Sequence, residues 1–407
     1  MKIIEPIKKK NRVEILDVIR GFAILGIIIA NIQSWSGYKF IPFELLESLN
    51  FYSINDTIKY FFMFLIDTKF YTLFSILFGI GFYIQFASQK QNQLVFMKTY
   101  RKRIWFLVMF GAIHSFFWSG DILMIYGLVG LVFIMFRNLQ EKTMLILAFI
   151  FYYIYLVYDI IFALFFPDMA TVTPLAYKTY PDISPSQMTE IFQNGSFWEI
   201  LQRNWHNLYY RYLDLIPSGR LTKLLALFLL GYYLMSINYF TTYARSVKLL
   251  FLLIILGVGI EYVAIEIGGS MSVYSQDLTN VLYKFLSATG QIFLALSYIS
   301  ILAILDEKAF FKKFFHLFAY VGRMSFTNYL MQTLLGFFIF HPSFGGLFGT
   351  MGLLEISTLA VLLYSFQILF SFIWLKFFAF GPLEWVWRCL SYSKIFPILR
   401  QNNVSKK

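Results

Sequence analysis

The sequence predicts an all-α fold, a polytopic bundle of about ten transmembrane helices with both termini in the cytoplasm. Composition is the first observation behind this prediction. Of the 407 residues, 59% are hydrophobic, 21% are aromatic and only 14% are charged, against roughly 25% charged residues in soluble domains. A soluble globule could not bury so much apolar surface, because the buried fraction rises only slowly with chain length. The same composition excludes a disordered chain, a coiled coil and a nucleic-acid-binding module.

Apolar stretches long enough to cross a bilayer are the second observation. A hydrocarbon core about 30 Å thick needs roughly 20 apolar residues per helix. Such stretches run over 18–36, 70–88, 104–119, 121–136, 143–166, 221–238, 249–267, 281–305, 316–340 and 354–379. A further apolar piece, 57–66, is too short to span and precedes Asp67 and Lys69. We expect a re-entrant or interfacial segment there.

The distribution of Lys and Arg orients these spans. Most of these residues fall in the terminal segments and in the loops on one side, and few fall on the other side. Because cytoplasmic loops carry the excess of Lys and Arg, the crowded side is the cytoplasm. Basic loops beside anionic lipid then explain the net charge of +12 without a nucleic-acid partner. We expect a multi-pass protein of the cell membrane whose partner is the lipid bilayer, and a homo-oligomer stays open.

One long polar segment divides the chain. Residues 1–166 form an N-terminal transmembrane half, 167–219 an extracytoplasmic segment, and 220–407 a C-terminal transmembrane half. Within the polar segment, 198–215 predicts an amphipathic helix on the outer membrane surface. Its large side chains are Trp205, Tyr209, Tyr210 and Leu213. The single cysteine excludes a disulfide framework, a cysteine-based zinc site and an iron–sulfur cluster, and we expect no metal.

Ionisable residues inside a span are functional candidates, because their insertion costs several kcal/mol. At the start of the first span, Asp17 and Arg20 are three residues apart and share a helix face, so they can pair. One interpretation is an ion pair that fixes the depth of the helix. The other is that Arg20 receives a phosphate or pyrophosphate, which suits its guanidinium group. Spacing alone does not decide between the two.

The second candidate is the pair His114 and Asp121, on either side of a Ser-Gly break. A tight outer turn at this break would bring both residues to the same membrane depth. A carboxylate that orients an imidazole is the arrangement that a general base requires. The alternative is a structural histidine that bridges helices. For His206, His316 and His341 we expect structural or surface positions.

The third candidate is a polar stripe in the expected span 316–340. Arg323 lies at its inner side, and Asn328, Tyr329 and Gln332 follow towards the membrane centre. Lipid cannot satisfy such groups, so the stripe must face protein or water. Interhelical hydrogen bonding is one interpretation, and a substrate site is the other.

Three shorter features complete the set. After the last span, Glu384 and Arg388 are four residues apart among tryptophans, which is typical of an interfacial anchor with a local ion pair. Lys69 opens the second span, and Tyr126 follows the Gly-Asp turn at 120–121. The phosphate-binding, dinucleotide and hydrolase motifs of soluble enzymes are absent from the sequence.

Taken in order, these clusters resemble the YeiB-like family of bacterial integral membrane proteins over nearly the whole chain. The motifs are Leu16-Asp17…Arg20-Gly21…Gly26…Asn31, Lys69-Phe70…Phe74-Ser75…Phe78-Gly79, Gly120-Asp121-Ile122-Leu123…Tyr126, Gly322-Arg323-Met324-Ser325 with Thr327-Asn328-Tyr329, and Gly381-Pro382-Leu383-Glu384-Trp385…Arg388. The C-terminal part of that family is a domain of unknown function, so the resemblance implies a fold and leaves the activity open.

The opening motif is also distantly similar to two groups of membrane acyltransferases that use acyl-CoA. One group modifies cell-surface sugars, and the other includes heparan-glucosaminide acetyltransferase. The similarity implies acyl-CoA as co-substrate on the cytoplasmic side and an unknown acceptor outside. At the basic inner end, Arg20, Arg323 and Arg388 would hold the CoA phosphates, and Asp17 would belong to the same cofactor site. His114 with Asp121 would activate an acceptor hydroxyl or amine.

The chain departs from these enzymes at Asn31. In the sugar-modifying group a catalytic histidine follows the arginine at this spacing, and here Asn31 follows Arg20, which leaves His114 as the base. Three hypotheses stay open: a membrane acyltransferase, a transporter or exporter of a small molecule, lipid or peptide, and a non-catalytic envelope protein. The remaining candidates belong to substrate contacts or to the polar stripe, namely Asn31, Lys69, Tyr126, Asn328, Tyr329, Gln332 and Glu384.

Overall fold

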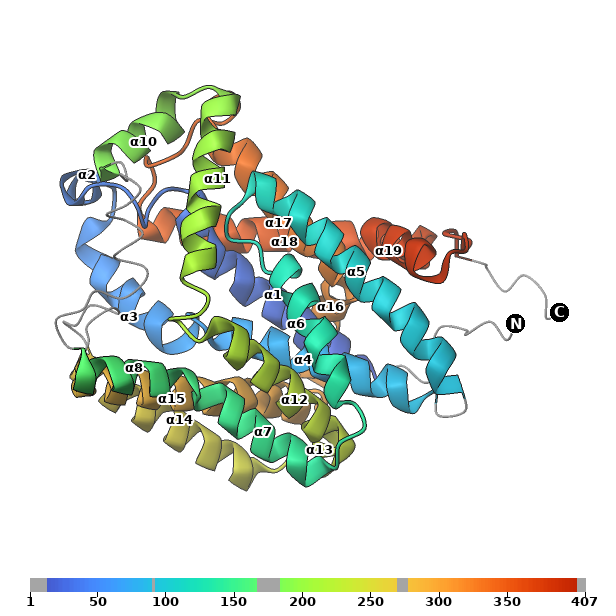
Figure 1. Ribbon diagram of the computed structural model, residues 1–407. Coiled ribbons are helices and arrows are strands. Elements are labelled where there is room, and N and C mark those ends of the chain that lie inside the picture. Colours follow the sequence, from blue (N-terminus) through green and yellow to red (C-terminus); the bar gives the residue numbers. More distant parts are fainter. Residues whose placement is uncertain (1–12, 90–91, 167–183, 269–276, 401–407) are drawn as a thin grey trace.

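The computed structural model describes residues 13–89, 92–166, 184–268 and 277–400. These residues form helices joined by short connections (Figure 1). The helices are α1 (Glu14–Trp35), α2 (Phe43–Ser48), η2 (Tyr52–Ile54), α3 (Asn55–Leu65), α4 (Lys69–Ala87), α5 (Gln93–Phe117), α6 (Leu123–Phe133), η4 (Ile134–Phe136), α7 (Glu141–Tyr153), α8 (Tyr155–Phe165), α10 (Pro185–Asn194), α11 (Phe197–Leu213), α12 (Arg220–Ser236), α13 (Tyr239–Thr242), α14 (Val247–Gly268), α15 (Leu278–Leu305), α16 (Ala309–Arg323), α17 (Ser325–Phe340), α18 (Leu353–Phe377) and α19 (Pro382–Tyr392). The predicted all-α class is confirmed.

Among the described residues, six helical stretches are long and apolar enough to cross a membrane. They are Glu14–Trp35, Tyr52–Ala87, Glu141–Phe165, Val247–Gly268, Leu278–Leu305 and Leu353–Phe377. Three further expected spans coincide with α5, with α6 and η4, and with α12. The predicted transmembrane helix bundle is therefore confirmed as a class. The count of ten spans, the cytoplasmic termini and the three-part division of the chain stay predictions.

The single helix expected over 316–340 is wrong. The segment forms two helices, α16 and α17, separated at Met324, whose φ of −118° and ψ of 32° interrupt the helix. The carboxylate of Glu384 accepts hydrogen bonds from the backbone N–H groups of Phe326 and Thr327 at 2.8 and 3.1 Å. It thereby satisfies donors that the first turn of α17 leaves unpaired.

Helix α1 lies at the centre of the bundle. It packs against α4, α15, α16, α17 and α18, and its side chains Ile19, Ile24 and Ile28 are fully buried. Helices α7, α8, α14 and α15 form the lower layer in Figure 1. Helix α11 stands steeply across the others at the left of that view, and α19 lies at the opposite end. We call these the α11 end and the α19 end.

Glycines bring two pairs of helices into backbone contact. A Cβ atom at Gly21 would lie 2.0 Å from a carbonyl oxygen of α16, and one at Gly322 would lie 1.9 Å from a carbonyl oxygen of α1. Helices α4 and α12 meet in the same way at Gly79 and Gly231, where the corresponding distances are both 2.0 Å. Small residues permit this close approach in membrane helices. The two crossings fix α1, α4 and α12, which supply walls of the cavity described next.

Candidate functional site

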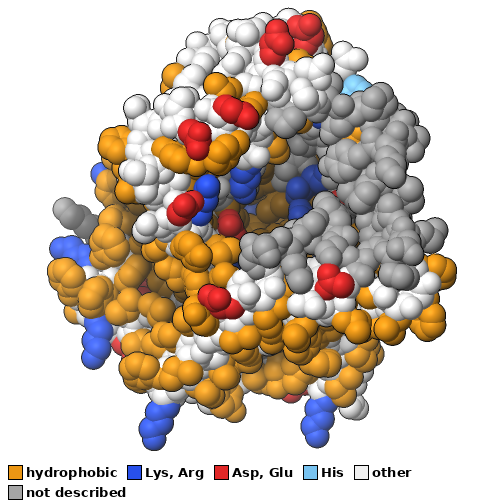
Figure 2. Space-filling model, turned by 90° about the vertical axis from the view of Figure 1, so that its left-hand side faces the viewer, with side chains coloured by type: hydrophobic (Ala, Val, Ile, Leu, Met, Phe, Trp, Pro, Cys, Tyr) orange, Lys and Arg blue, Asp and Glu red, His pale blue; other side chains and the backbone are white. Residues whose placement is uncertain are grey.

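A cavity of about 750 Å³ opens at the α11 end. Figure 2 shows this end face on, with a hollow in which Lys and Arg side chains lie. Its walls come from the last turns of α1, the start of α4, the α5–α6 turn, α8, α11, the start of α12, α15 and the end of α17. Cavities of this size are typical of small-molecule sites.

One part of the cavity lining is aromatic. Trp35 and Trp118 both line it, with ring centroids 5.2 Å apart in an edge-on arrangement. Asn31 and Ser34 lie on the same part of α1 and also face the cavity. Asn31 is therefore the one residue of the predicted site that lines this cavity.

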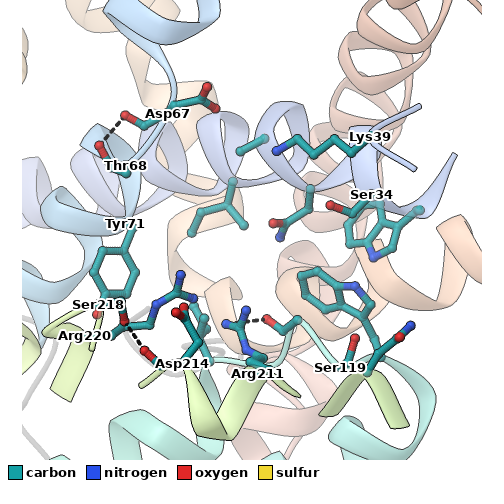
Figure 3. Close-up of a pocket in the computed structure, with 18 of the residues that line it drawn as sticks. Ser34, Lys39, Asp67, Thr68, Tyr71, Ser119, Arg211, Asp214, Ser218 and Arg220 are labelled. Atoms are coloured by element: carbon teal, nitrogen blue, oxygen red, sulfur yellow. Dashed lines mark hydrogen bonds between the residues drawn. The ribbon is translucent and has the colours of Figure 1, made fainter. Parts of the chain in front are cut away.

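A second part of the lining, which we call the cationic wall, carries positive charge. Arg211 comes from the end of α11, and Arg220 and Lys223 come from the first turn of α12. Arg211 and Arg220 extend into the open space in Figure 3. The charged lining consists of Lys39, Arg211, Arg220, Lys223 and Lys284 with Asp67, Asp159 and Asp214. Positive charge is thus in excess.

Arg211 links the cavity to the turn between α5 and α6. Its Nη2 donates to the carbonyl oxygens of Gly120 and Asp121, both at 3.4 Å. Burial, followed by the neighbouring positive charge of Arg220, lowers the pKa of Arg211 from 12.5 to about 10. The guanidinium therefore stays charged at neutral pH.

The predicted pairing of His114 with Asp121 is confirmed. His114 Nδ1 lies 2.7 Å from Asp121 Oδ1, and both side chains are buried. The second oxygen, Oδ2, accepts a hydrogen bond from the backbone N–H of Met124 at 2.9 Å. Within the described part of the chain, His114 Nε2 is buried and has no hydrogen-bond partner. A carboxylate on Nδ1 leaves Nε2 as the nitrogen that can accept a proton.

Two features hold the α5–α6 hairpin that carries this pair. Gly111 lets α6 come close, since a Cβ there would lie 2.1 Å from the backbone nitrogen of Met124. Asn204, buried on α11, accepts from the Ser119 N–H at 2.6 Å and donates to the carbonyl oxygens of Ser115 and Phe116 at 2.9 and 2.7 Å. The predicted amphipathic helix is therefore a packed element over this turn, with Ile200, Leu208 and Tyr210 buried and Trp198, Trp205 and Tyr209 exposed.

His114 and Asp121 lie one side chain behind the cavity wall. Neither residue lines the cavity, although Trp118 does. The ring of His114 lies 5.9 Å from that of Trp118 and 5.4 Å from that of Tyr329, in each case centroid to centroid. The hydroxyl of Tyr329 accepts the Ile122 N–H at 3.3 Å. Nε2 is buried, so an acceptor in the cavity would reach it only after a side chain of the wall moved.

The residues predicted for CoA phosphates lie away from this cavity. Asp17 and Arg20 form the expected ion pair at 2.9 Å, with Asp17 buried and the Arg20 side chain 27% exposed. Arg323 ends α16, and the guanidinium of Arg388 stacks over Phe380 at 4.2 Å. None of the four predicted residues lines the cavity.

Two of the predicted polar residues are buried in contacts between helices. Lys69 is 1% exposed and forms an ion pair of 2.6 Å with Glu261 of α14. Tyr126 shares a hydrogen bond of 2.6 Å with Ser75 of α4. Both contacts join segments that are far apart in the sequence.

Interhelical hydrogen bonds account for the polar stripe. Asn328 Nδ2 donates to Ser371 Oγ at 2.9 Å, and Gln332 Nε2 donates to Gln367 Oε1 at 2.9 Å and to the Ile24 carbonyl oxygen at 3.2 Å. Gln367 Nε2 returns a bond of 2.8 Å to the Asn328 carbonyl oxygen. These bonds tie α17 to α18 and α1, as the structural interpretation of the stripe expects.

Replacing Glu384 with alanine is expected to lower the free energy of unfolding by about 1–3 kcal/mol, because two buried N–H groups at the start of α17 lose their acceptor. Thermal unfolding of the detergent-purified protein measures the change. Glu47→Ala, at an exposed position of α2, is the matched control. Equal unfolding temperatures for the two variants would show that the hydrogen bonds of Glu384 to the start of α17 add nothing to the stability of the protein.

The cationic wall is the part of the site that the sequence did not predict. Arg211, Arg220, Lys223 and Lys284 are missing from the candidate residues. A signal exists for all four. Arg211 and Arg220 lie in segments assigned to the outside, where Lys and Arg are few. The orientation of the spans does not explain Lys and Arg on the outer side, so such residues are candidates for a functional site. Lys223 and Lys284 lie inside the expected spans 221–238 and 281–305, where ionisable residues are costly.

Fold and site together define a helical membrane protein with a charged cavity at one end. Residues 234–394 match the family described as "Protein of unknown function (DUF418)". The chain is similar to uncharacterized protein YxaH of Bacillus subtilis (strain 168), with 28% identity over 99% of this chain and 100% of the relative. It is 29% identical to an uncharacterized 39.9 kDa protein in the amylase 3' region of Bacillus acidopullulyticus, over 97% of this chain and 98% of the relative.

A third similarity is to uncharacterized protein YeiB of Escherichia coli (strain K12), with 28% identity over 95% of this chain and 98% of the relative. No solved structure matches the chain. The matches support the YeiB-like family that the motifs indicated. Since all three relatives are uncharacterized, the activity is inferred from the site.

Proposed function

We propose that this protein is a multi-pass acyltransferase of the cell membrane, which moves an acyl group from cytoplasmic acyl-CoA to an acceptor outside, such as a cell-envelope sugar. One observation carries the proposal: the buried 2.7 Å contact between His114 Nδ1 and Asp121, which leaves Nε2 without a partner among the described residues. A general base needs this combination of an oriented ring and a free nitrogen.

The chemistry assigned to His114 is proton transfer. The acceptor oxygen or nitrogen attacks the thioester carbonyl carbon of acyl-CoA while Nε2 takes its proton. The new bond to the acyl carbon forms, the carbon–sulfur bond breaks, and the same proton passes from Nε2 to the CoA sulfur. Asp121 stabilises the positively charged imidazole between these two steps, as in other carboxylate–histidine pairs.

The donor and the acceptor are assigned to opposite ends of the bundle. Arg20, Arg323 and Arg388, towards the α19 end, hold the CoA phosphates, and Asp17 orients Arg20 through their ion pair. The acceptor enters the cavity at the α11 end and reaches Nε2 when a side chain of the wall moves. The similarity of the opening motif to membrane acyltransferases supports the choice of an acyl group.

Replacing His114 with glutamine is expected to lower the rate of acyl transfer by roughly 10²–10⁴-fold, which is the usual contribution of a general base. The measurement follows labelled acetyl groups from acetyl-CoA into envelope material in detergent-permeabilised membranes, where both sides are accessible. Asp121→Asn should lose activity as well, because the ring loses its orienting charge.

The matched control is His206→Gln, since His206 is exposed on α11 and hydrogen-bonds to the carbonyl oxygen of Gln202 in the same helix. This variant should transfer at the wild-type rate. If His114→Gln folds and transfers as well as His206→Gln does, His114 is not the base and the proposal is rejected.

A second candidate, transport of an anionic solute, is favoured by the cationic wall of a cavity that opens at one end. It predicts movement of solute across proteoliposomes with no covalent product. If the solute moves and no acylated product forms, the acyltransferase hypothesis is rejected and transport is the function. A protein that does neither would fit the non-catalytic envelope hypothesis.

A further inference from the structure

The cavity holds a cluster of cations from two consecutive helices. Helix α11 ends at Leu213 and α12 begins at Arg220, with Gly219 in the left-handed region at φ 64° between them. The reversal places Arg211, Arg220 and Lys223 on one wall of the cavity. The start of α12 adds the positive end of a helix dipole at the same point.

Protein groups neutralise this cluster only in part. Lys284 is paired with Asp159 at 3.0 Å, and the Lys223 ammonium lies 3.8 Å from the centre of the Tyr155 ring. Within the described residues, the Arg220 guanidinium has no hydrogen bond or ion pair, and Arg211 Nε is buried without a partner. Partly buried cations that face one another are stabilised by an anion placed between them.

The aromatic part of the lining suits the uncharged part of a ligand. Trp35 and Trp118 present aromatic surface, and Asn31 and Ser34 offer neutral donors and acceptors beside them. A ligand that spans the cavity would therefore place an anionic group at one side and a hydroxylated group at the other. Phosphate oxygens match the donor fork of arginine.

We propose that Arg211, Arg220 and Lys223 bind the phosphate of a sugar or polyol phosphate ester, whose hydroxyl groups lie against Trp35 and Trp118. This inference rests on the proposed function in one respect, because it makes the phosphate ester the acceptor. Through its contact with the carbonyl oxygen of Asp121, Arg211 couples the bound phosphate to the turn that carries the catalytic pair. The binding site itself is testable without any acyl transfer.

The test measures binding of sn-glycerol 3-phosphate to the full-length protein in detergent, by ligand-dependent thermal stabilisation. Glycerol is the matched neutral probe. We expect glycerol 3-phosphate to stabilise the protein and glycerol to have no effect. Arg220→Gln and Lys223→Gln should each weaken binding by about tenfold or more, and Arg220→Lys should retain part of the affinity because it keeps the charge.

Arg245→Gln is the matched control, since Arg245 is partly exposed, pairs with Glu307 and does not line the cavity. It should bind as the wild type does. Each variant is compared by its unfolding temperature without ligand, so that a folding defect is separated from a binding defect. Equal affinity of Arg220→Gln and the wild type would overturn the proposal, and so would equal binding of glycerol and glycerol 3-phosphate.

Two sources could supply this phosphate ester, a soluble metabolite or a lipid headgroup. In nanodiscs, phosphatidylglycerol instead of phosphatidylcholine should stabilise the wild type but not Arg220→Gln if the source is lipid. Stabilisation by soluble glycerol 3-phosphate alone identifies the soluble source. If neither soluble glycerol 3-phosphate nor phosphatidylglycerol stabilises the protein in a way that depends on Arg220, the site is rejected.

His114→Gln separates this inference from the proposed function. It should keep glycerol 3-phosphate binding while it loses acyl transfer, because His114 lies behind the wall that the ligand contacts. If binding depends on Arg220 but His114→Gln transfers normally, the phosphate site stands and the proposed catalysis fails. If His114→Gln loses transfer but Arg220→Gln binds normally, the catalysis stands and the phosphate site fails.

Discussion

Replacing Lys69 with methionine is expected to lower the free energy of unfolding by about 3–5 kcal/mol. The side chains of Lys69 and Glu261 are 1% and 3% exposed, and their charged atoms lie 2.6 Å apart. The Lys69 ammonium also donates to the carbonyl oxygen of Met63. Without the lysine, Glu261 is left buried between α4 and α15 with no opposite charge. Thermal or denaturant unfolding in detergent measures the loss.

The double variant Lys69→Met with Glu261→Gln is the control for this prediction. Because it removes both charges, it should recover most of the lost stability. Lys69 does not line the cavity, so the double variant should also bind glycerol 3-phosphate with wild-type affinity. A single Lys69→Met variant that unfolds at the wild-type temperature would show that the buried pair contributes no net stability.

Replacing Gly79 with alanine is also expected to lower the free energy of unfolding. The added Cβ would lie 2.0 Å from a carbonyl oxygen of α12, so the two helices must separate or α4 must bend. Overpacking of a buried contact costs about 1–3 kcal/mol, and here the obstructing atom belongs to a backbone that cannot rotate away. The measured quantities are unfolding temperature and the yield of folded protein.

Gly259→Ala on α14 is the matched control, because a Cβ at that position would have no heavy atom within 4 Å. Alanine is the better helix former, so this variant should be as stable as the wild type or more stable by up to about 1 kcal/mol. If both glycine variants behave alike, close approach of α4 and α12 is not what selects glycine at position 79.

Local patterns in the sequence predicted most of the helices and the hairpin of the site. Apolar run length located α1, α14, α15 and α18 within a few residues, because bilayer thickness fixes the length that a span needs. The contact between His114 and Asp121 followed from the turn between them, since residues on both sides of a tight turn lie at similar depth. The helix positions and the His114–Asp121 contact could both be predicted because each depends on residues that are close together in the sequence.

Long-range contacts could not be predicted in this way. The break at Met324 depends on the carboxylate of Glu384, 58 residues beyond the first backbone N–H that it accepts. Lys69 is one of the candidate residues, but its partner Glu261 is 192 residues away. Glu261 is an ionisable residue inside the expected span 249–267, which marks it as a candidate without indicating its partner. The cationic wall of the cavity likewise forms only when α11, α12 and α15 come together.

The crossing of α1 and α16 joins the segment that matches the family description to a helix outside that segment. The segment that matches the family description, 234–394, contains α16, yet the backbone against which Gly322 fits belongs to α1, outside that segment. Helix α12, which packs on α4, α6 and α7, ends just inside the same boundary. In this chain, residues 234–394 thus pack on helices that lie outside that segment. Removing α1 would therefore expose the face of α16 that Gly322 keeps in contact with it.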